Sequence, residues 1–150
     1  MPVVSLPTHC ARAADLAPAT MYALLRLRVD VFVVEQQCCY PELDGRDLEP
    51  RTEHRWIEDA AGPVAYLRVL ADKDEQRIGR VCTRADARGA GHAARLVGET
   101  VERHAGGPIS LDAQAYLVRF YAGFGFAATG PEFLDDGIPH VPMTRPPDQP

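Results

Sequence analysis

The sequence predicts one α/β domain with a mixed sheet, and three observations lead to this prediction. Residues 18–32 and 92–104 carry apolar side chains at spacings of three, four and seven, which is typical of amphipathic helices. Between them lie three strand-like segments joined by turns short enough for hairpins. The chain has 150 residues, of which 46% are hydrophobic and 25% charged, which suits one globular domain with its own core.

The first half of the chain is predicted to run from an edge strand through a helix and a loop into an antiparallel meander. Residues 3–6 fit a short edge strand, and a helix is expected from Pro18 onward. Residues 38–54 are rich in turn formers and acids, so they predict a long loop, and loops of this length are usually functional or mobile. The meander strands are expected at 54–58, 64–70 and 77–83.

In the second half, a helix is expected to begin after Gly91 and to end at the Gly-Gly-Pro of residues 106–108. A strand at 109–115, a short helix at 116–124 and a strand at 137–144 follow by the same criteria. The domain is expected to span residues 6–147, with a disordered tail at 148–150.

Arg28 lies in the middle of the apolar stripe of the first helix. An unpaired buried guanidinium would be very costly, so we expect a structural charge with a carboxylate partner. Glu35 and Asp47 are the expected partners.

Charge and cysteine content exclude several classes of function. A net charge of −5 argues against a nucleic-acid surface, which needs clustered Lys and Arg. No apolar run is long enough for a membrane span and the N-terminus lacks signal-peptide features, so a cytoplasmic location is expected. The four cysteines form no metal or disulfide pattern, which predicts reduced thiols and no metal site, with Cys82 as a small buried hydrophobic residue.

A glycine-containing turn connects the strand ending near Thr83 to the helix that starts at Gly91. Free N–H groups and the positive end of the helix dipole make such a turn suitable for a phosphate, although a glycine that merely eases the corner explains it equally well. A P-loop is excluded because His92 and Ala93 follow where Lys and Ser or Thr are required. A dinucleotide-binding turn is disfavoured, since it belongs after the first strand.

Five segments together carry a resemblance to a known family. "RVCTRADARGAGHAARLV" resembles the acetyl-CoA signature of the GNAT superfamily of N-acetyltransferases, [RQ]-x-x-G-x-[GA], with Arg88, Gly91 and Ala93 at its defined places. "LVRFYAGFGF" resembles the later Tyr and Gly-Phe element of that superfamily. "LLRLRVDVFVVEQ", "ELDGRD" and "DDGIPHVPM" resemble its ElaA-like subgroup. The likeness extends from about Leu16 to Arg145.

The resemblance implies a GNAT-like mixed, mainly antiparallel central sheet of about six to seven strands, flanked by helices and splayed between strands 4 and 5. It places pantetheine in the splay, at Val81, Cys82 and Thr83, and pyrophosphate on the following turn. The residues it implies for contact with acetyl-CoA are Val81, Cys82, Thr83, Arg88, Gly89, Ala90, Gly91, His92, Ala93, Gln114 and Tyr121.

The resemblance also implies roles in the chemistry. Tyr121 would be the general acid that protonates the departing thiolate, although its spacing with neighbouring aromatic residues also fits core packing. The backbone N–H near Cys82 would stabilise the oxyanion. Many relatives carry a glutamate on the fourth strand, but "RIGRVCT" contains no carboxylate. The base candidates are therefore Glu35, Asp44, Asp112, His54 and His140, of which Glu35 is the one assigned to the catalytic site.

The expected function is an acetyl-CoA-dependent N-acetyltransferase that acts by direct attack of a primary amine in a ternary complex. The amine substrate is expected to be a small molecule or a peptide. No nucleic acid, membrane or metal is expected to take part, and the protein could form a homodimer. Glu35, Asp44 and His140 are the substrate-binding candidates, within an acidic rim that also includes Asp47, Asp135 and Asp136; a solvated acidic surface explains most of these acids as well. The alternative is a non-catalytic acyl-CoA-binding or sensing module.

Overall fold

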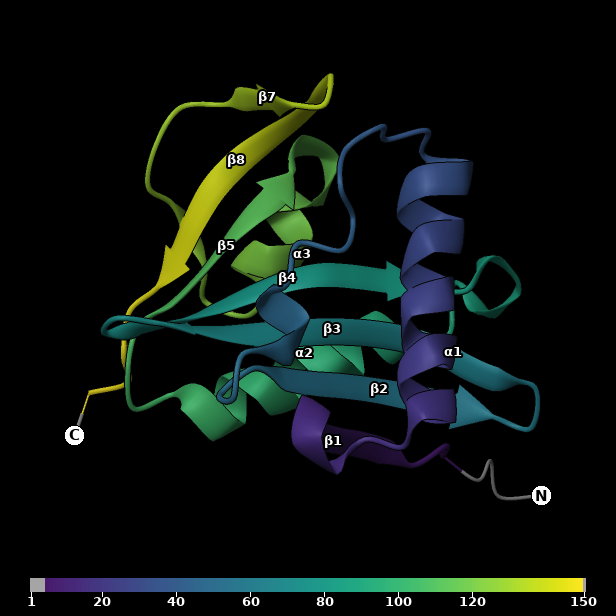
Figure 1. Ribbon diagram of the computed structural model, residues 1–150. Helices are drawn as coiled ribbons and strands as arrows, with labels where there is room; N and C mark the ends of the chain where they lie inside the picture. Colours follow the sequence, from purple (N-terminus) through teal and green to yellow (C-terminus); the bar gives the residue numbers. More distant parts are fainter. Residues whose placement is uncertain (1–4, 150) are drawn as a thin grey trace.

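The computed structural model describes residues 5–149, in which one eight-stranded sheet forms the centre of the molecule (Figure 1). The strand order is β1-β2-β3-β4-β5-β8-β6, with β7 paired to β8, and every pair is antiparallel except β4–β5. The predicted mixed, mainly antiparallel sheet is thus confirmed, with eight strands where six to seven were expected. The strands are Thr8–Arg12 (β1), Glu53–Asp59 (β2), Gly62–Asp72 (β3), Glu75–Thr83 (β4), Ile109–Gln114 (β5), Ala127–Ala128 (β6), Phe133–Asp135 (β7) and Ile138–Arg145 (β8).

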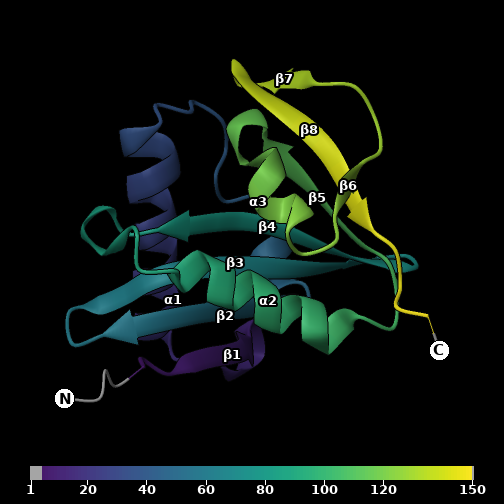
Figure 2. The same cartoon turned by 180° about the vertical axis from the view of Figure 1, so that it is seen from behind.

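Helices cover both faces of the sheet. Helix α1 (Pro18–Arg28) crosses one face, and α2 (His92–His104) crosses the other, as the two opposite views show (Figures 1 and 2). Pro18 begins α1, where its fixed φ favours a first turn and its missing N–H costs nothing. The short α3 (Val118–Ala122) follows β5. None of the helices within residues 5–149 is long and apolar enough to cross a bilayer.

The core is divided between the two faces. On the α1 side, Leu24, Leu27 and Phe32 pack against Trp56 and Tyr66 of the sheet. On the α2 side, the periodic residues Leu96, Val97 and Val101 pack onto Ile57, Leu67 and Leu111, among others. The central strand β3 is buried continuously from residue 64 to 70, so side chains on both of its faces are excluded from water. This two-sided burial matches the sequence of β3, which is an almost unbroken apolar run.

The sheet opens between β4 and β5. Their parallel pairing comprises Gln76 with Ile109 and Arg77 with Ser110, after which β4 continues to Thr83 without a partner on β5. A bulge in the β3–β4 ladder, beside Leu67, accompanies this divergence, and Arg80 there has a φ of +55°. A non-glycine residue in this region costs roughly 1 to 2 kcal/mol, and bulges of this kind redirect the strand. The splay implied by the resemblance is therefore present.

Several local predictions differ from the structure. Residues 3 and 4 of the predicted edge strand lie outside the described part of the chain, residues 5 and 6 are not in a strand, and the edge strand is β1 at 8–12. The helix expected to reach residue 32 is α-helical only to Arg28, and Val29–Glu35 continue as a wider π-helical segment. Strands β6 and β7 were not predicted because they are short and exposed, without apolar alternation. At the C-terminal end, the Asp148 N–H donates a 2.8 Å hydrogen bond to the Ala105 carbonyl.

Arg28 anchors the loop of residues 38–54. Its side chain is fully buried and lies 2.6 Å from an oxygen of Asp47 and 2.9 Å from an oxygen of Glu42. The expected partner Asp47 is confirmed, whereas Glu35 is wrong and Glu42 takes its place. Two more arginines contact Glu42, Asp47 and the exposed Asp44, so three guanidiniums and three carboxylates form one ion network whose centre is buried. Its members are Arg28, Arg68, Arg80, Glu42, Asp44 and Asp47.

A second ion pair joins β2 to α2 and gives a testable pH dependence. Glu53 accepts from His104 Nε2 at 3.1 Å and from Arg55 at 3.0 Å. Burial raises the pKa of the Glu53 carboxyl, but His104 and Arg55 outweigh this and hold the pKa at about 2, below its ordinary 4.5. Because the pKa of Glu53 is lower in the folded than in the unfolded chain, its ion pairs stabilise the fold above pH 4.5, and this stabilisation is lost as the pH falls toward 2.

We expect Glu53→Gln to reduce the free energy of unfolding by up to about 3 kcal/mol at pH 6, and the deficit to vanish near pH 2. Urea denaturation at several pH values measures this difference. Glu58→Gln is the control, because Glu58 lies on the same strand as Glu53, its side chain is 41% exposed, and it also pairs with a histidine, His9 of β1, at 3.2 Å. A deficit independent of pH would contradict the assignment.

Candidate functional site

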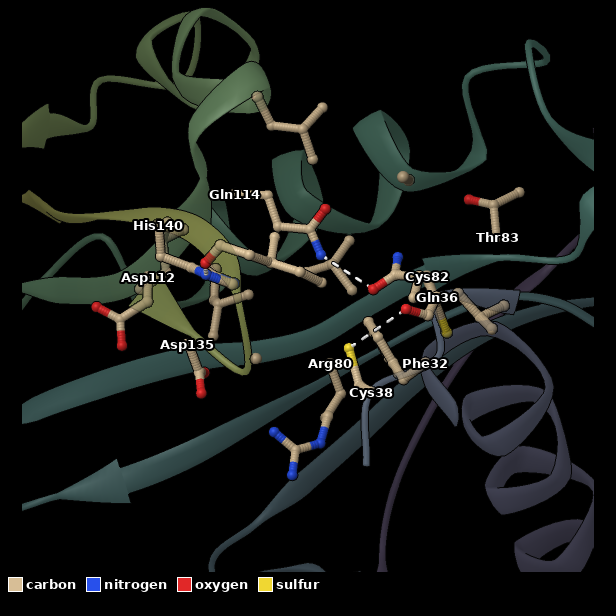
Figure 3. Close-up of a pocket in the computed structure, with 18 of the residues that line it drawn as sticks. Phe32, Gln36, Cys38, Arg80, Cys82, Thr83, Asp112, Gln114, Asp135 and His140 are labelled. Carbon is tan, nitrogen blue, oxygen red and sulfur yellow. Dashed lines mark hydrogen bonds between the residues drawn. The ribbon is translucent and has the colours of Figure 1, made fainter. Parts of the chain in front are cut away.

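A cavity of about 470 Å³ opens where β4 and β5 diverge. Its walls come from the π-helical segment, both splayed strands, α3 and the β7–β8 hairpin. Figure 3 shows its labelled side chains in spatial order from one end to the other: Thr83, then Cys82 with Gln36 and Gln114, then His140, Asp135 and Asp112. Residues distant in sequence are therefore brought together by the splay.

The glycine turn lies at the Thr83 end of the cavity, which reaches Arg88 and Ala93. Gly89 and Gly91 have φ values of +82° and +80°, and a Cβ added at either would meet nothing within 4 Å. The first helical hydrogen bond of α2 runs from the Arg95 N–H to the Gly91 carbonyl, so the N–H groups before Arg95 start the helix without such a partner. An exposed turn with open space over its backbone fits a phosphate group.

The four turn residues between Arg88 and Ala93, which are Gly89, Ala90, Gly91 and His92, do not themselves line the cavity. Arg88 forms a two-pronged ion pair with Glu35, with 2.8 and 2.9 Å contacts, and its Nε donates to the Thr83 carbonyl. The hydrogen bond from Arg88 lowers the pKa of the Glu35 carboxyl. A carboxylate held in this way is a weak proton acceptor, which argues against Glu35 as the base.

The middle of the cavity is bridged by two amides and contains a buried thiol. Gln114 Nε2 on β5 donates to Gln36 Oε1 at 3.2 Å, across the divergence of the strands. Cys82 is 5% exposed, as predicted for a small buried residue, and burial raises its thiol pKa to about 12. Such a thiol stays protonated and unreactive, so any role of Cys82 in chemistry lies with its backbone. Val81 and Thr83, its neighbours, also line the cavity.

Tyr121 belongs both to the core and to the cavity wall. Its ring packs edge-on against Phe120 at 5.0 Å and Phe126 at 6.1 Å, and it is 5% exposed. Burial raises the pKa of its hydroxyl well above the usual value of 10, so the group remains a proton donor at neutral pH. Within residues 5–149 the Tyr121 hydroxyl has no hydrogen-bond partner. The core packing expected for its ring is present, and its hydroxyl is free to donate.

The other polar candidates fall into two groups. Asp44 is held by Arg68 at 2.6 Å and does not line the cavity. His54 is fully buried between the Tyr66 hydroxyl and the Asp47 carbonyl, so its role is structural. Asp112 lines the cavity but pairs with Arg77.

The predicted acidic rim is therefore divided. Asp47 is buried in the ion network, and Asp136 lies in the turn between β7 and β8 with a φ of +49°. Asp135 and His140 line the cavity.

Sequence reasoning missed Gln36, Cys38 and Tyr40 as lining residues. Cys38 and Tyr40 lie at the start of the predicted long loop, which indicated function without naming residues, and Gln36 ends the segment "LLRLRVDVFVVEQ" just before that loop. No group of three or more His, Cys, Asp or Glu side chains in the described part of the chain could hold a metal ion. All four cysteines are free thiols.

Comparisons with known proteins agree on one family. A model described as "Acetyltransferase (GNAT) domain" matches residues 28–146. The UPF0039 protein Mb2876c of Mycobacterium bovis is 52% identical over 139 residues, which cover 89% of each chain. A crystal structure of an acyl-CoA N-acyltransferase from Pseudomonas aeruginosa superposes with a TM-score of 0.90 at 39% identity, covering 94% of this chain and 99% of that one. Escherichia coli ElaA gives a TM-score of 0.88 at 35% identity, with the same coverage.

Proposed function

Because the chain belongs to the GNAT acetyltransferase family, we propose that it is an N-acetyltransferase that moves the acetyl group of acetyl-CoA to a primary amine. The observation that carries this proposal is the continuity of the cavity. It runs from Thr83, past Cys82, to a polar end at Asp135 and His140, and Tyr121 also lines it. A thioester and an amine can therefore meet inside one site.

Three groups of the chain supply the chemistry in this proposal. The pyrophosphate binds the N–H groups from Arg88 to Ala93, and pantetheine lies along Val81 to Thr83, where β4 lacks a β5 partner. The backbone N–H near Cys82 stabilises the oxyanion that forms on the carbonyl. The Tyr121 hydroxyl, kept protonated by burial, gives its proton to the departing thiolate.

Direct attack in a ternary complex is favoured over an acyl-enzyme. A covalent route through cysteine needs a thiolate in the cavity, and burial raises the thiol pKa of both cysteines that line it, Cys38 and Cys82. Initial-rate kinetics distinguish the routes. Intersecting double-reciprocal lines support direct attack, whereas parallel lines indicate an acyl-enzyme.

Release of free thiol from acetyl-CoA, followed over a panel of small amines and peptides, tests the function. Propionyl- and butyryl-CoA in parallel define the acyl preference. Amine-dependent thiol release supports the proposal. Tight binding of acetyl-CoA without release for any amine would instead support a sensing module.

We expect Gly91→Ala to weaken acetyl-CoA binding at least tenfold. Its Cβ would occupy open space above the turn, where the phosphate must approach, and the φ of +80° is strained for alanine. Gly45→Ala is the matched control, with a φ of +82°, equally open surroundings and no place in the cavity.

Isothermal calorimetry of both variants, with thermal unfolding to compare their stability, separates strain from lost binding. The two should lose similar stability, and only Gly91→Ala should lose affinity. Undiminished affinity in Gly91→Ala would remove the phosphate-turn assignment.

A further inference from the structure

We propose that His140 is the catalytic base that takes the proton from the attacking amine, which rests on the proposed acetyl transfer. The base is the one role that the fourth strand leaves unfilled, since β4 carries no carboxylate between Arg77 and Thr83. His140 lies on β8, opposite Gln114 of β5, and its side chain lines the end of the cavity away from the glycine turn (Figure 3).

One hydrogen bond determines the tautomer of His140. Its Nδ1 lies 2.7 Å from the backbone carbonyl oxygen of Ile138. A carbonyl oxygen only accepts, so Nδ1 must carry a proton. In the neutral ring Nε2 is then the nitrogen with a free lone pair, and it is the atom able to accept a proton.

A second contact fixes the plane of the ring. The His140 imidazole stacks on Phe133 of β7, with ring centroids 5.8 Å apart and planes inclined by 26°. Stacking on one side and a hydrogen bond on the other leave the ring little rotational freedom. A base held in one orientation needs no reorganisation when the amine arrives.

The carboxylates that line the cavity either form ion pairs with arginine or are less suited than imidazole to act as the base. Glu35 is paired with Arg88, and Asp112 with Arg77. Asp135 also lines the cavity, but a carboxylate is a weaker base than imidazole and therefore further from an amine in basicity. Proton transfer is most efficient when base and donor are closer in basicity.

The step balances as follows. The lone pair of the neutral amine forms the C–N bond as the carbonyl π pair moves to oxygen, and the nitrogen becomes cationic. Nε2 of His140 takes one proton from that nitrogen. The oxyanion then collapses, the C–S bond breaks, and the thiolate receives a proton from Tyr121. His140 returns its proton to solvent and Tyr121 regains one, leaving an amide and free coenzyme A.

Nitrogen NMR of the full-length protein tests the geometry without any activity. At a pH where His140 is neutral, its shifts should show a protonated Nδ1 and an unprotonated Nε2. The opposite tautomer would overturn the proposal.

Kinetics test the chemistry with acetyl-CoA and an amine that the panel identifies. His140→Gln keeps a polar side chain of similar reach and should lower the single-turnover rate about 100-fold, with the affinity for acetyl-CoA retained. His9→Gln is the matched control, because His9 lies on β1 and outside the cavity. Asp135→Asn tests the competing carboxylate: whatever its effect on amine binding, it should keep the pH-dependent limb that His140→Gln loses.

The dependence on pH distinguishes a base from a residue that merely positions substrate. The parent should lose kcat/KM as the pH falls and His140 takes up a proton, and His140→Gln should lack this limb. Exogenous imidazole should restore part of the rate of His140→Ala. The other ionisable side chains that line the cavity also affect this profile. They are Glu35, Cys38, Tyr40, Arg68, Arg77, Arg80, Cys82, Arg88, Asp112, Tyr116, Tyr121 and Asp135.

An unchanged rate and pH profile in His140→Gln would refute the base while leaving acetyl transfer intact. Absence of amine-dependent turnover in the parent would refute the proposed function, and the NMR result would still report on the tautomer.

Discussion

Tyr121→Phe is expected to lower the rate of acetyl transfer by about 10²- to 10⁴-fold, while acetyl-CoA binds as before. Phenylalanine keeps the ring that packs against Phe120 and Phe126, and it deletes a hydroxyl that has no hydrogen-bond partner within residues 5–149. The fold should therefore be retained. The rate would fall because the coenzyme A thiolate would have to leave without a proton donor.

Single-turnover measurement of acetyl transfer is the appropriate assay, because product release then has no influence on the rate. Tyr22→Phe is the matched control, since Tyr22 on α1 is 72% exposed and lies outside the cavity. If Tyr121→Phe transfers acetyl at the parent's rate across the pH range, Tyr121 is a packing residue and another group is the acid.

Arg28→Met is expected to lower the free energy of unfolding by about 3 kcal/mol, the low end of the range for breaking a buried ion pair. The change leaves Glu42 and Asp47, each about 5% exposed, without their shared guanidinium. Arg80 and Arg68 still contact these acids at 2.7 and 3.1 Å, which is why a larger loss is not expected.

Urea denaturation measures this loss, and Arg26→Met is the control on the same helix. The Arg26 side chain is 74% exposed, and its contact with Asp30 is long, at 3.9 Å. We expect the control to change stability by less than about 0.5 kcal/mol. Equal unfolding midpoints for Arg28→Met and the parent would show that the ion pairs of Arg28 contribute nothing to stability.

Elements with a strong local pattern were predictable from the sequence. The apolar face of α2 and the burial of β3 follow from side-chain periodicity, and the turn at Gly91 from its glycines. Strand β1 was displaced in the prediction because "THCAR" lacks clear alternation and is stabilised by pairing with β2.

The partners of the ion pairs were less predictable, because they depend on tertiary arrangement. Glu35 lies seven residues from Arg28 on the same helical stretch, yet it faces Arg88, which is 53 residues away. The π-helical winding after Arg28 changes the direction in which later side chains point, and no sequence periodicity reports it. The role proposed for His140 likewise depends on a backbone contact that only the β7–β8 hairpin creates.

The divergence of β4 and β5 also links folding to the supply of ligand. Two residue pairs join these strands, and the backbone beyond them offers its donors and acceptors to the cavity. A molecule bound there takes the place of a missing strand and binds only the folded chain. At a concentration 100 times its dissociation constant, such a ligand adds about 2.7 kcal/mol to the free energy of unfolding. Under the proposed function, the cellular lifetime of this protein would therefore rise and fall with the acyl-CoA pool.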